Sequence, residues 1–235
     1  MAEERIAERI DANLLDVTME DLHDMPKQLY EGKITKLREK TQGQLVIKEY
    51  PTASAHSGHF KSLMNELALK KSFRPDVIFI DYLNICASSR FKGGNISSYF
   101  YVKAIAEELR GLAVEFNVPI FSATQTTRTG YVSTDIGLED TSESFGLPAT
   151  ADFMFALISN EELEALGQMK VKQLKNRYND PSINRAFIIG VDRAKMRLYD
   201  VQQKAGDIVD ANQVDEKEDA YNKFSDFKIW MYNMN

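Results

Sequence analysis

The sequence predicts an α/β fold with a mostly parallel sheet, and three observations indicate it. Residues 77–80 form an unbroken Val-Ile-Phe-Ile run, which is typical of a strand buried on both faces in the centre of a parallel sheet. A second strand is predicted at residues 120–125. Amphipathic patterns over residues 60–71 and 96–116 predict helices before each of these strands. Strands that alternate with helices are typical of this fold class.

Helices dominate the first part of the chain. Apolar residues recur every four positions from Ile6 to Leu14, Thr18 is positioned to cap a short second helix, and Pro26 begins a third. Residues 44–50 alternate apolar and polar side chains and predict a strand. Because a domain of this class should begin with a strand, we expect the chain to start inside a fold.

Short strands are predicted in the second half. Residues 152–158 form another buried run, and residues 169–174 form a strand that ends in Lys-Asn-Arg. Residues 186–191 and 195–201 are two strand-like segments joined by Asp-Arg-Ala, a pattern typical of a hairpin. The sequence therefore predicts a C-terminal β-hairpin.

The composition changes at residue 205. Residues 205–235 contain seven Asp or Glu against three Lys, and residues 205–220 are expected to be a solvated acidic linker. We therefore predict one domain over residues 1–204 and a tail beyond it. The aromatic cluster at residues 224–232 is either a docking segment for a partner or a helix packed on its own domain.

Overall composition is that of a globular protein. The chain has 235 residues, of which 43% are hydrophobic and 27% charged, and no run approaches the roughly 18 apolar residues of a membrane span. No signal-peptide pattern is present, so we expect no membrane association and a cytoplasmic location. The single cysteine, Cys86, fits a reducing compartment and is expected to fill the core. A net charge of −6 argues against a protein coated in basic surface but is compatible with a narrow basic channel, because binding depends on local Lys and Arg.

Polar side chains follow the two predicted parallel strands. Asp81 comes directly after residues 77–80, and Gln125 ends the next strand. Ligands of open α/β sheets bind at the carboxyl ends of strands, and a carboxylate there can hold Mg²⁺ that bridges nucleotide phosphates, the Walker B arrangement. A neutral amide beside it can sense the γ-phosphate or orient the attacking water. For Asp81 the alternative is an ordinary turn aspartate.

Two loops are candidates for contact with nucleic acid. Residues 87–95 combine small residues and glycines with Arg90, Phe91 and Lys92, a common way to grip a nucleic-acid backbone, although a solvated connection is an equal alternative. Asn95 is placed to cap the following helix. Residues 126–141 form a long polar loop, and uninterrupted loops of this length are usually functional or mobile.

Four motifs resemble those of RecA-like hexameric replicative helicases of the DnaB type. The Walker B strand of the family resembles residues 76–83, Asp-Val-Ile-Phe-Ile-Asp-Tyr-Leu. The strand that follows it in the family, whose Gln senses nucleotide state, looks like residues 118–128, Val-Pro-Ile-Phe-Ser-Ala-Thr-Gln-Thr-Thr-Arg. Residues 143–152 resemble the segment after the second DNA-binding loop, and residues 175–177 the Lys-x-Arg of the arginine finger. The resemblance covers about residues 1–202 and is closest to T-even-type phage helicases.

The resemblance implies a RecA-like three-layer sandwich that hydrolyses ATP with Mg²⁺. It implies a hexameric ring that translocates on single-stranded DNA in the cytoplasm of a phage-infected bacterium, with primase or a helicase loader as further partners. Asp81 would hold Mg²⁺, Gln125 would couple nucleotide state to the next loop, and Lys175 and Arg177 would stabilise transition-state charge in the neighbouring subunit. The residues implied to face DNA in the central channel are Arg90, Lys92, Asn95, Arg128 and Tyr131.

One departure from the family pattern concerns nucleotide binding. No G-x-x-x-x-G-K-[ST] run occurs, and Gly32-Lys33 lacks both the earlier Gly and the following Ser or Thr. In the family a catalytic Glu immediately precedes a Met that opens a helix, and Met1 matches that Met. We therefore expect a C-terminal portion that lacks the P-loop strand and helix, either a split-gene product or a truncation, whose partner is the half that carries the P-loop.

Two alternatives remain at this point. The chain could belong to another RecA-like ATPase, such as a recombinase, which would assemble as a filament rather than a ring. It could also be a non-enzymatic module that keeps the fold and recruits a partner through residues 205–235. Deleting residues 205–235 and testing whether the shortened chain still assembles would distinguish an interaction module from an enzyme.

Overall fold

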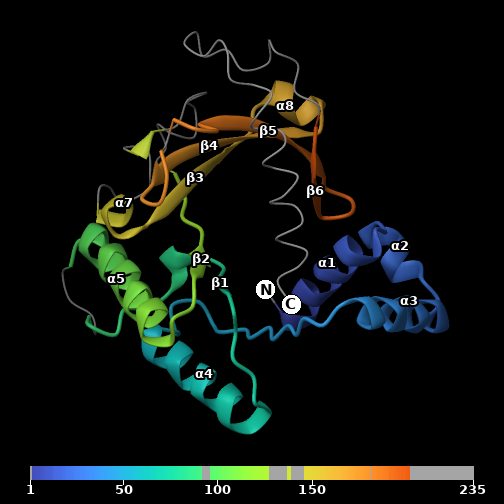
Figure 1. Cartoon of the computed structure of the whole chain (residues 1–235), viewed down its shortest axis with the longest axis horizontal. Coiled ribbons are helices and arrows are strands. Elements are labelled where there is room, and N and C mark those ends of the chain that lie inside the picture. Colours follow the sequence, from blue (N-terminus) through green and yellow to red (C-terminus); the bar gives the residue numbers. More distant parts are fainter. Residues whose placement is uncertain (1, 92–95, 127–136, 139–145, 181, 202–235) are drawn as a thin grey trace. The chain divides into compact units, whose positions relative to one another are not determined.

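The computed structural model describes residues 2–91, 96–126, 137–138, 146–180 and 182–201. The chain divides into two compact units, one made of Met1–Glu49 with Ile188–Asn235 and the other of Tyr50–Phe187 (Figure 1). The linker and docking segment predicted after residue 204 lie outside the described residues.

The first unit contains three helices and the C-terminal hairpin. Its elements are α1 (Glu3–Leu15), α2 (Met19–Asp24), α3 (Lys27–Lys40), the greater part of β5 (Ala186–Asp192), and β6 (Arg197–Asp200). Strands β5 and β6 pair antiparallel, with Ile189 opposite Asp200, so the predicted hairpin is confirmed. Thr18 caps α2 as predicted, because its side chain accepts a hydrogen bond from the Asp21 N–H at 3.0 Å.

Ionic contacts tie the hairpin turn to the end of α1 within this unit. The Asp16 carboxylate accepts hydrogen bonds from Lys195 Nζ at 3.1 Å and from an Arg197 guanidinium nitrogen at 2.9 Å, and these contacts lower the pKa of Asp16. Asn13 Nδ2 donates to the Met196 carbonyl at 2.7 Å. Exposed ion pairs add little stability, so their main effect is to orient the hairpin turn on α1.

The strand predicted at residues 44–50 is wrong. Residues 41–50 contain neither helix nor strand, and Leu45 is exposed. The Glu49 N–H donates to the Glu3 carboxylate at 2.9 Å instead of to a neighbouring strand. Alternating side chains favour a strand only where another strand lies alongside, and this segment lies against a helix terminus instead.

The second unit holds the candidate sites. Its elements are α4 (Ser57–Lys71), β1 (Ile78–Ile80), the 3₁₀-helix η1 (Leu83–Ile85), α5 (Ser98–Phe116), β2 (Ile120–Ser122), α7 (Gly146–Thr150), β3 (Phe153–Ile158), α8 (Glu161–Ala165) and β4 (Gln168–Asn176). Strand β1 pairs with β2 in parallel, and β3 pairs with β4 antiparallel. The α/β class predicted from the sequence is therefore confirmed, with one parallel and one antiparallel pairing among the described strands of this unit.

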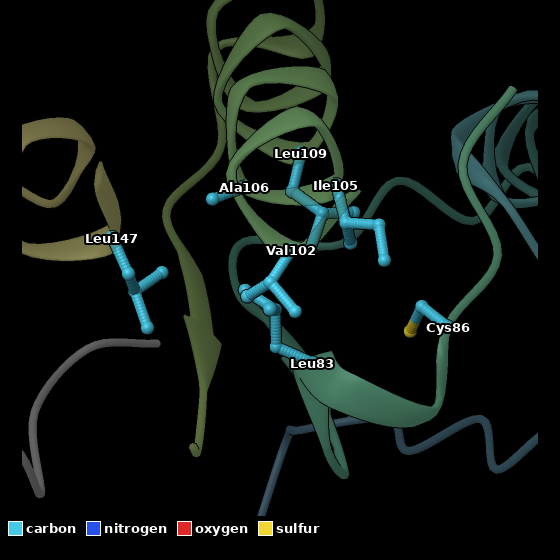
Figure 2. Close-up of a cluster of buried hydrophobic side chains, with 7 residues drawn as sticks. All are labelled: Leu83, Cys86, Val102, Ile105, Ala106, Leu109 and Leu147. Carbon is cyan, nitrogen blue, oxygen red and sulfur yellow. The ribbon is translucent and has the colours of Figure 1, made fainter. Parts of the chain in front are cut away.

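Helix α5 forms the core of this unit (Figure 2). Its N-cap residue is Ser97, so the prediction that Asn95 caps this helix is wrong. Ile105 is 1% exposed, and it belongs to a cluster with Leu109 on α5, Leu83 on η1, and Cys86. Ile80 of β1 packs against the same cluster. Cys86 is core filler as predicted, and its burial raises the pKa of the thiol. No described helix is both long and apolar enough to cross a bilayer.

The expectation that both faces of β1 are buried is wrong. Phe79 is 73% exposed and Phe121 of β2 is 48% exposed, and the two rings stack with their centroids 5.4 Å apart. The α5 cluster packs against Ile80, whose side chain lies on the opposite face of β1 from Phe79 because successive strand residues alternate. In the described part of the chain, one face of this parallel pair is therefore apolar and open to solvent.

We predict that the α5 core controls the stability of the second unit. Leu109→Ala removes a side chain that is 4% exposed and should lower the free energy of unfolding by roughly 2–5 kcal/mol. Leu69→Ala is the matched control, because Leu69 on α4 is 86% exposed and its loss should change that energy by less than about 0.5 kcal/mol. Urea unfolding of both variants measures the difference, and equal losses would contradict this packing.

Candidate functional site

Asp81 and Gln125 lie at the same edge of the parallel pair. Ile80 is in register with Ser122, so both strands end together, with Asp81 directly after β1 and Gln125 three residues after Ser122. The Gln125 side-chain amide donates to the Tyr82 hydroxyl at 3.4 Å. The structure therefore brings the two predicted strand-end residues to the same edge of the parallel pair.

The segments that follow the two strands stay joined beyond the sheet. The Leu83 N–H donates to the Ala123 carbonyl at 3.1 Å, and the Thr124 hydroxyl donates to the Asn84 side-chain oxygen at 2.8 Å. These hydrogen bonds join the segment that follows β1 to the segment that follows β2.

The Asp81 carboxylate suits a hard divalent cation. Its residue is exposed, and no cationic side chain pairs with it among the described residues. Mg²⁺ prefers carboxylate oxygens and keeps several waters, so one carboxylate at an open strand end is a fitting ligand. The 235 residues contain no phosphate-binding loop motif of the G-x-x-x-x-G-K-[ST] type.

Lys175 and Arg177 gather at the start of β3 and the end of α7. An Arg177 guanidinium nitrogen lies 3.1 Å from Asp152 Oδ1, and a second donates to the Ala149 carbonyl at 3.1 Å. Lys175 Nζ donates to the Pro148 carbonyl. The carbonyl ends of a helix attract cations, so α7 and Asp152 together hold both predicted finger residues.

A third cation, Arg110 of α5, belongs to this cluster and was missed from the sequence. It lies 2.7 Å from Asp152 Oδ2, so Arg110 and Arg177 bind the two oxygens of one carboxylate. Partial burial opposes ionisation of Asp152, but the two arginines outweigh it and lower its pKa. Burial and the nearby Arg177 lower the pKa of Lys175. Three cations around one carboxylate leave an excess of positive charge, which suits a phosphate.

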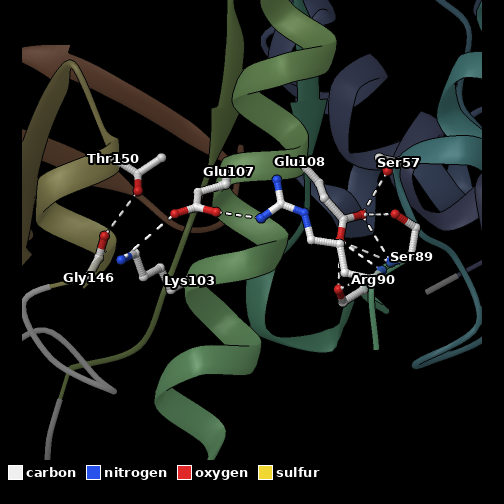
Figure 3. Close-up of polar contacts among 9 residues, drawn as sticks. Ser57, Ser89, Arg90, Lys103, Glu107, Glu108, Gly146 and Thr150 are labelled. Carbon is white, nitrogen blue, oxygen red and sulfur yellow. Dashed lines mark hydrogen bonds and ion pairs between the residues drawn. The ribbon is translucent and has the colours of Figure 1, made fainter. Parts of the chain in front are cut away.

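Arg90 is held by an ion pair rather than standing free (Figure 3). Its guanidinium pairs with Glu107 of α5, and Lys103 Nζ lies 3.8 Å from the other oxygen of the same carboxylate. The Arg90 side chain is about half exposed, so a ligand in solvent can still reach it. The other predicted DNA-facing residues lie outside the described residues, namely Lys92, Asn95, Arg128 and Tyr131.

Glu108, also missed from the sequence, anchors the segment that carries Arg90. Its carboxylate accepts hydrogen bonds from the Ser57 hydroxyl at 2.7 Å, the Ser88 hydroxyl at 2.6 Å and the Ser89 N–H at 3.0 Å. Partial burial opposes ionisation, but the hydrogen bonds from Ser88, Ser89 and Ser57 together lower the pKa of Glu108 to about 2. The ionised form of Glu108 is therefore the one that the fold selects.

Comparison with solved structures identifies the class of fold. One similar structure is an ATPase domain, with a TM-score of 0.69 and 16% identity over 86% of this chain and 72% of that chain. A DnaB-like replicative helicase, solved in a study of its interactions with primase, gives a TM-score of 0.68 and 16% identity over 86% of this chain and 50% of that chain. The fold is therefore that of RecA-like helicase ATPase domains, as predicted.

Sequence comparison then identifies the family. The model of the DnaB-like helicase C terminal domain matches residues 1–205, and the chain belongs to this family. The DnaB-like replicative helicase of Enterobacteria phage T4 is 43% identical over 231 residues, which is 95% of this chain and 49% of the relative. The chain thus spans about half the length of this curated relative, and the predicted resemblance to phage replicative helicases is confirmed.

The anchor at Glu108 predicts a specific dependence of stability on pH. A carboxylate whose pKa falls on folding stabilises the protein above its unfolded pKa and loses that effect as pH falls through the folded value. The destabilisation caused by Glu108→Gln should therefore be full above about pH 4.5 and should shrink toward pH 2. Urea unfolding across this range measures it, with Glu115→Gln on the same helix as the control for loss of one negative charge. A loss of unfolding free energy in Glu108→Gln that does not vary with pH would contradict the role of ionised Glu108 as the anchor of this segment.

Proposed function

We propose that this chain is the C-terminal part of the ATPase domain of a replicative DNA helicase, which hydrolyses ATP at the subunit interfaces of a hexameric ring and translocates on single-stranded DNA. The observation that carries the proposal is the parallel pairing of β1 with β2, which brings Asp81 and Gln125 to one edge. Because the chain belongs to the DnaB-like helicase family, we assign ATP hydrolysis to this edge.

At this edge the chain's own residues have distinct roles. Asp81 would hold Mg²⁺ directly or through water, and that ion would supply positive charge for the nucleotide phosphates. Gln125 faces the same edge and orients the attacking water or responds to the γ-phosphate. Its hydrogen bond to Tyr82 links that response to the backbone beside Asp81.

The cationic cluster at the end of β4 serves a neighbouring subunit. Arg177 is about half exposed, so a phosphate on an adjacent copy can reach its guanidinium and take the place of Asp152 as its partner. Charge spreads over the γ-phosphoryl oxygens in the transition state, and a guanidinium stabilises it there. Lys175 adds a second positive charge beside it.

A segment that carries the P-loop is the proposed cover for the open face of β1 and β2. Parallel sheets are normally covered on both faces, and a sheet of two strands is rarely stable alone. The stacked rings of Phe79 and Phe121 supply an apolar surface for such a segment. ATP binding then requires both the P-loop segment and the edge that carries Asp81.

The remaining partners follow from the helicase role. Arg90, together with the loop residues outside the described part of the chain, is the proposed contact with single-stranded DNA. The structure of one similar helicase was solved in a study of its interactions with primase, which supports primase as a candidate partner. A helicase loader and the cytoplasm of a phage-infected bacterium complete the proposal. The family match favours this function over a recombinase or a non-catalytic module.

One prediction of this proposal concerns ATP hydrolysis. The 235-residue chain with ATP, Mg²⁺ and single-stranded DNA should release no phosphate above a blank, because the P-loop motif is absent from it. The same chain joined to a P-loop-bearing half from a helicase of this family should hydrolyse ATP, and Asp81→Asn should abolish that activity. ATP hydrolysis by the 235 residues alone would disprove the proposal that the nucleotide site is divided between this chain and the P-loop-bearing half.

Another prediction of this proposal concerns Arg177. In rings of the joined protein, Arg177→Ala should lower the rate of ATP hydrolysis on the order of 10³- to 10⁵-fold while nucleotide binding persists. Rings mixed with wild type should show that each mutant subunit silences its neighbour's site and not its own. Arg185→Ala, another exposed arginine of the same unit, is the control. A normal rate of ATP hydrolysis by an assembled Arg177→Ala ring would show that Arg177 is a surface residue without a role in hydrolysis.

A further inference from the structure

Two adjacent carboxylates on α5 contact the segment that carries Arg90 in different ways (Figure 3). Glu108 binds its backbone and serines, whereas Glu107 binds the Arg90 guanidinium. The difference matters because residues 88–91 bear the described part of the proposed DNA-contacting loop.

The contacts of Glu108 fix the course of the backbone. Its oxygens accept from the Ser89 N–H at 3.0 Å and from the Arg90 N–H at 3.3 Å, so two successive amides point at one carboxylate. The hydroxyls of Ser88 and Ser89 add hydrogen bonds of 2.6 and 2.7 Å. Ser57, at the start of α4, binds the same carboxylate and joins this anchor to a second helix. Loss of the acceptor would leave these donors without their partner and free the backbone beside Arg90.

The contacts of Glu107 instead neutralise positive charge. Its two oxygens pair with Arg90 and with Lys103, and all three side chains are between 37% and 50% exposed. Exposed ion pairs are weak, so a phosphate can replace Glu107 as the partner of Arg90. Glu108 instead holds the backbone N–H of Arg90, at a position where the Arg90 side chain is about half exposed.

We infer that the two glutamates act in opposite directions on nucleic-acid binding: Glu108 is a positioning residue that presents Arg90 to DNA, and Glu107 competes with DNA phosphate for the same guanidinium. This inference rests on the proposed function, in which the segment at Arg90 faces single-stranded DNA.

The test compares two substitutions that remove the same charge from neighbouring positions. General electrostatics predicts that Glu107→Gln and Glu108→Gln both strengthen binding of a polyanion. The inference predicts that Glu107→Gln tightens binding by about two- to fivefold, and that Glu108→Gln weakens it on the order of tenfold. Fluorescence anisotropy of the 235-residue chain with a labelled thymidine oligonucleotide, at several salt concentrations, measures both. Glu115→Gln, on the same helix but paired with Lys61, should bind like wild type.

Hydrogen exchange gives a readout that separates positioning from charge. The amides of Ser89 and Arg90 should exchange faster in Glu108→Gln and at the wild-type rate in Glu107→Gln. If Glu108→Gln fails to fold, Ser89→Ala removes one hydroxyl from the anchor and should weaken binding by a smaller factor.

The outcomes distinguish the inference from its premise. If the Arg90→Ala variant binds DNA as tightly as the wild type, this segment does not contact DNA, and the inference fails with that assignment. Weaker binding by Arg90→Ala together with unchanged or tighter binding by Glu108→Gln would overturn the positioning role alone. Unchanged binding by Glu107→Gln would overturn the competition.

Discussion

Burial of one face of α5 is the constraint on which the described sites depend. Ile105 and Leu109 fix the helix against η1 and the end of β1, and this determines where its polar residues point. Glu107 and Glu108 then meet the segment at Arg90, while Arg110, two residues further on, meets Asp152 and the finger cluster. One packed helix therefore positions the residues proposed for DNA and those proposed for the neighbouring nucleotide.

The fold was predictable where a local pattern and the tertiary packing agree. The helix predicted over residues 96–116 is observed at Ser98–Phe116, and the C-terminal hairpin has its predicted place, because an apolar stripe and a turn sequence are each encoded locally. Residues 44–50 and the exposed face of β1 were predicted wrongly for a related reason. Alternating or unbroken apolar residues indicate which side chains a strand could bury, but they do not indicate whether another element packs against that strand.

The candidate site was predictable to a similar extent. Asp81 and Gln125 could be identified because a polar residue at the end of an apolar run is visible in the sequence, and parallel pairing brings the two strand ends to one edge. Glu108 and Arg110 could not, since their partners lie 19 and 42 residues away and no short motif connects them. A run of charged residues in the middle of a mostly apolar helix was the only available indication.

The central claim is that this chain completes a nucleotide site in a neighbouring subunit. A structure of the assembled ring, formed with a P-loop-bearing half and bound to a non-hydrolysable ATP analogue and single-stranded DNA, tests it most directly. The account predicts that the Arg177 guanidinium lies within about 3 Å of the neighbour's γ-phosphate, with Asp81 at the Mg²⁺ of its own subunit. A ring in which Arg177 still pairs only with Asp152, while another cation contacts the γ-phosphate, would contradict it.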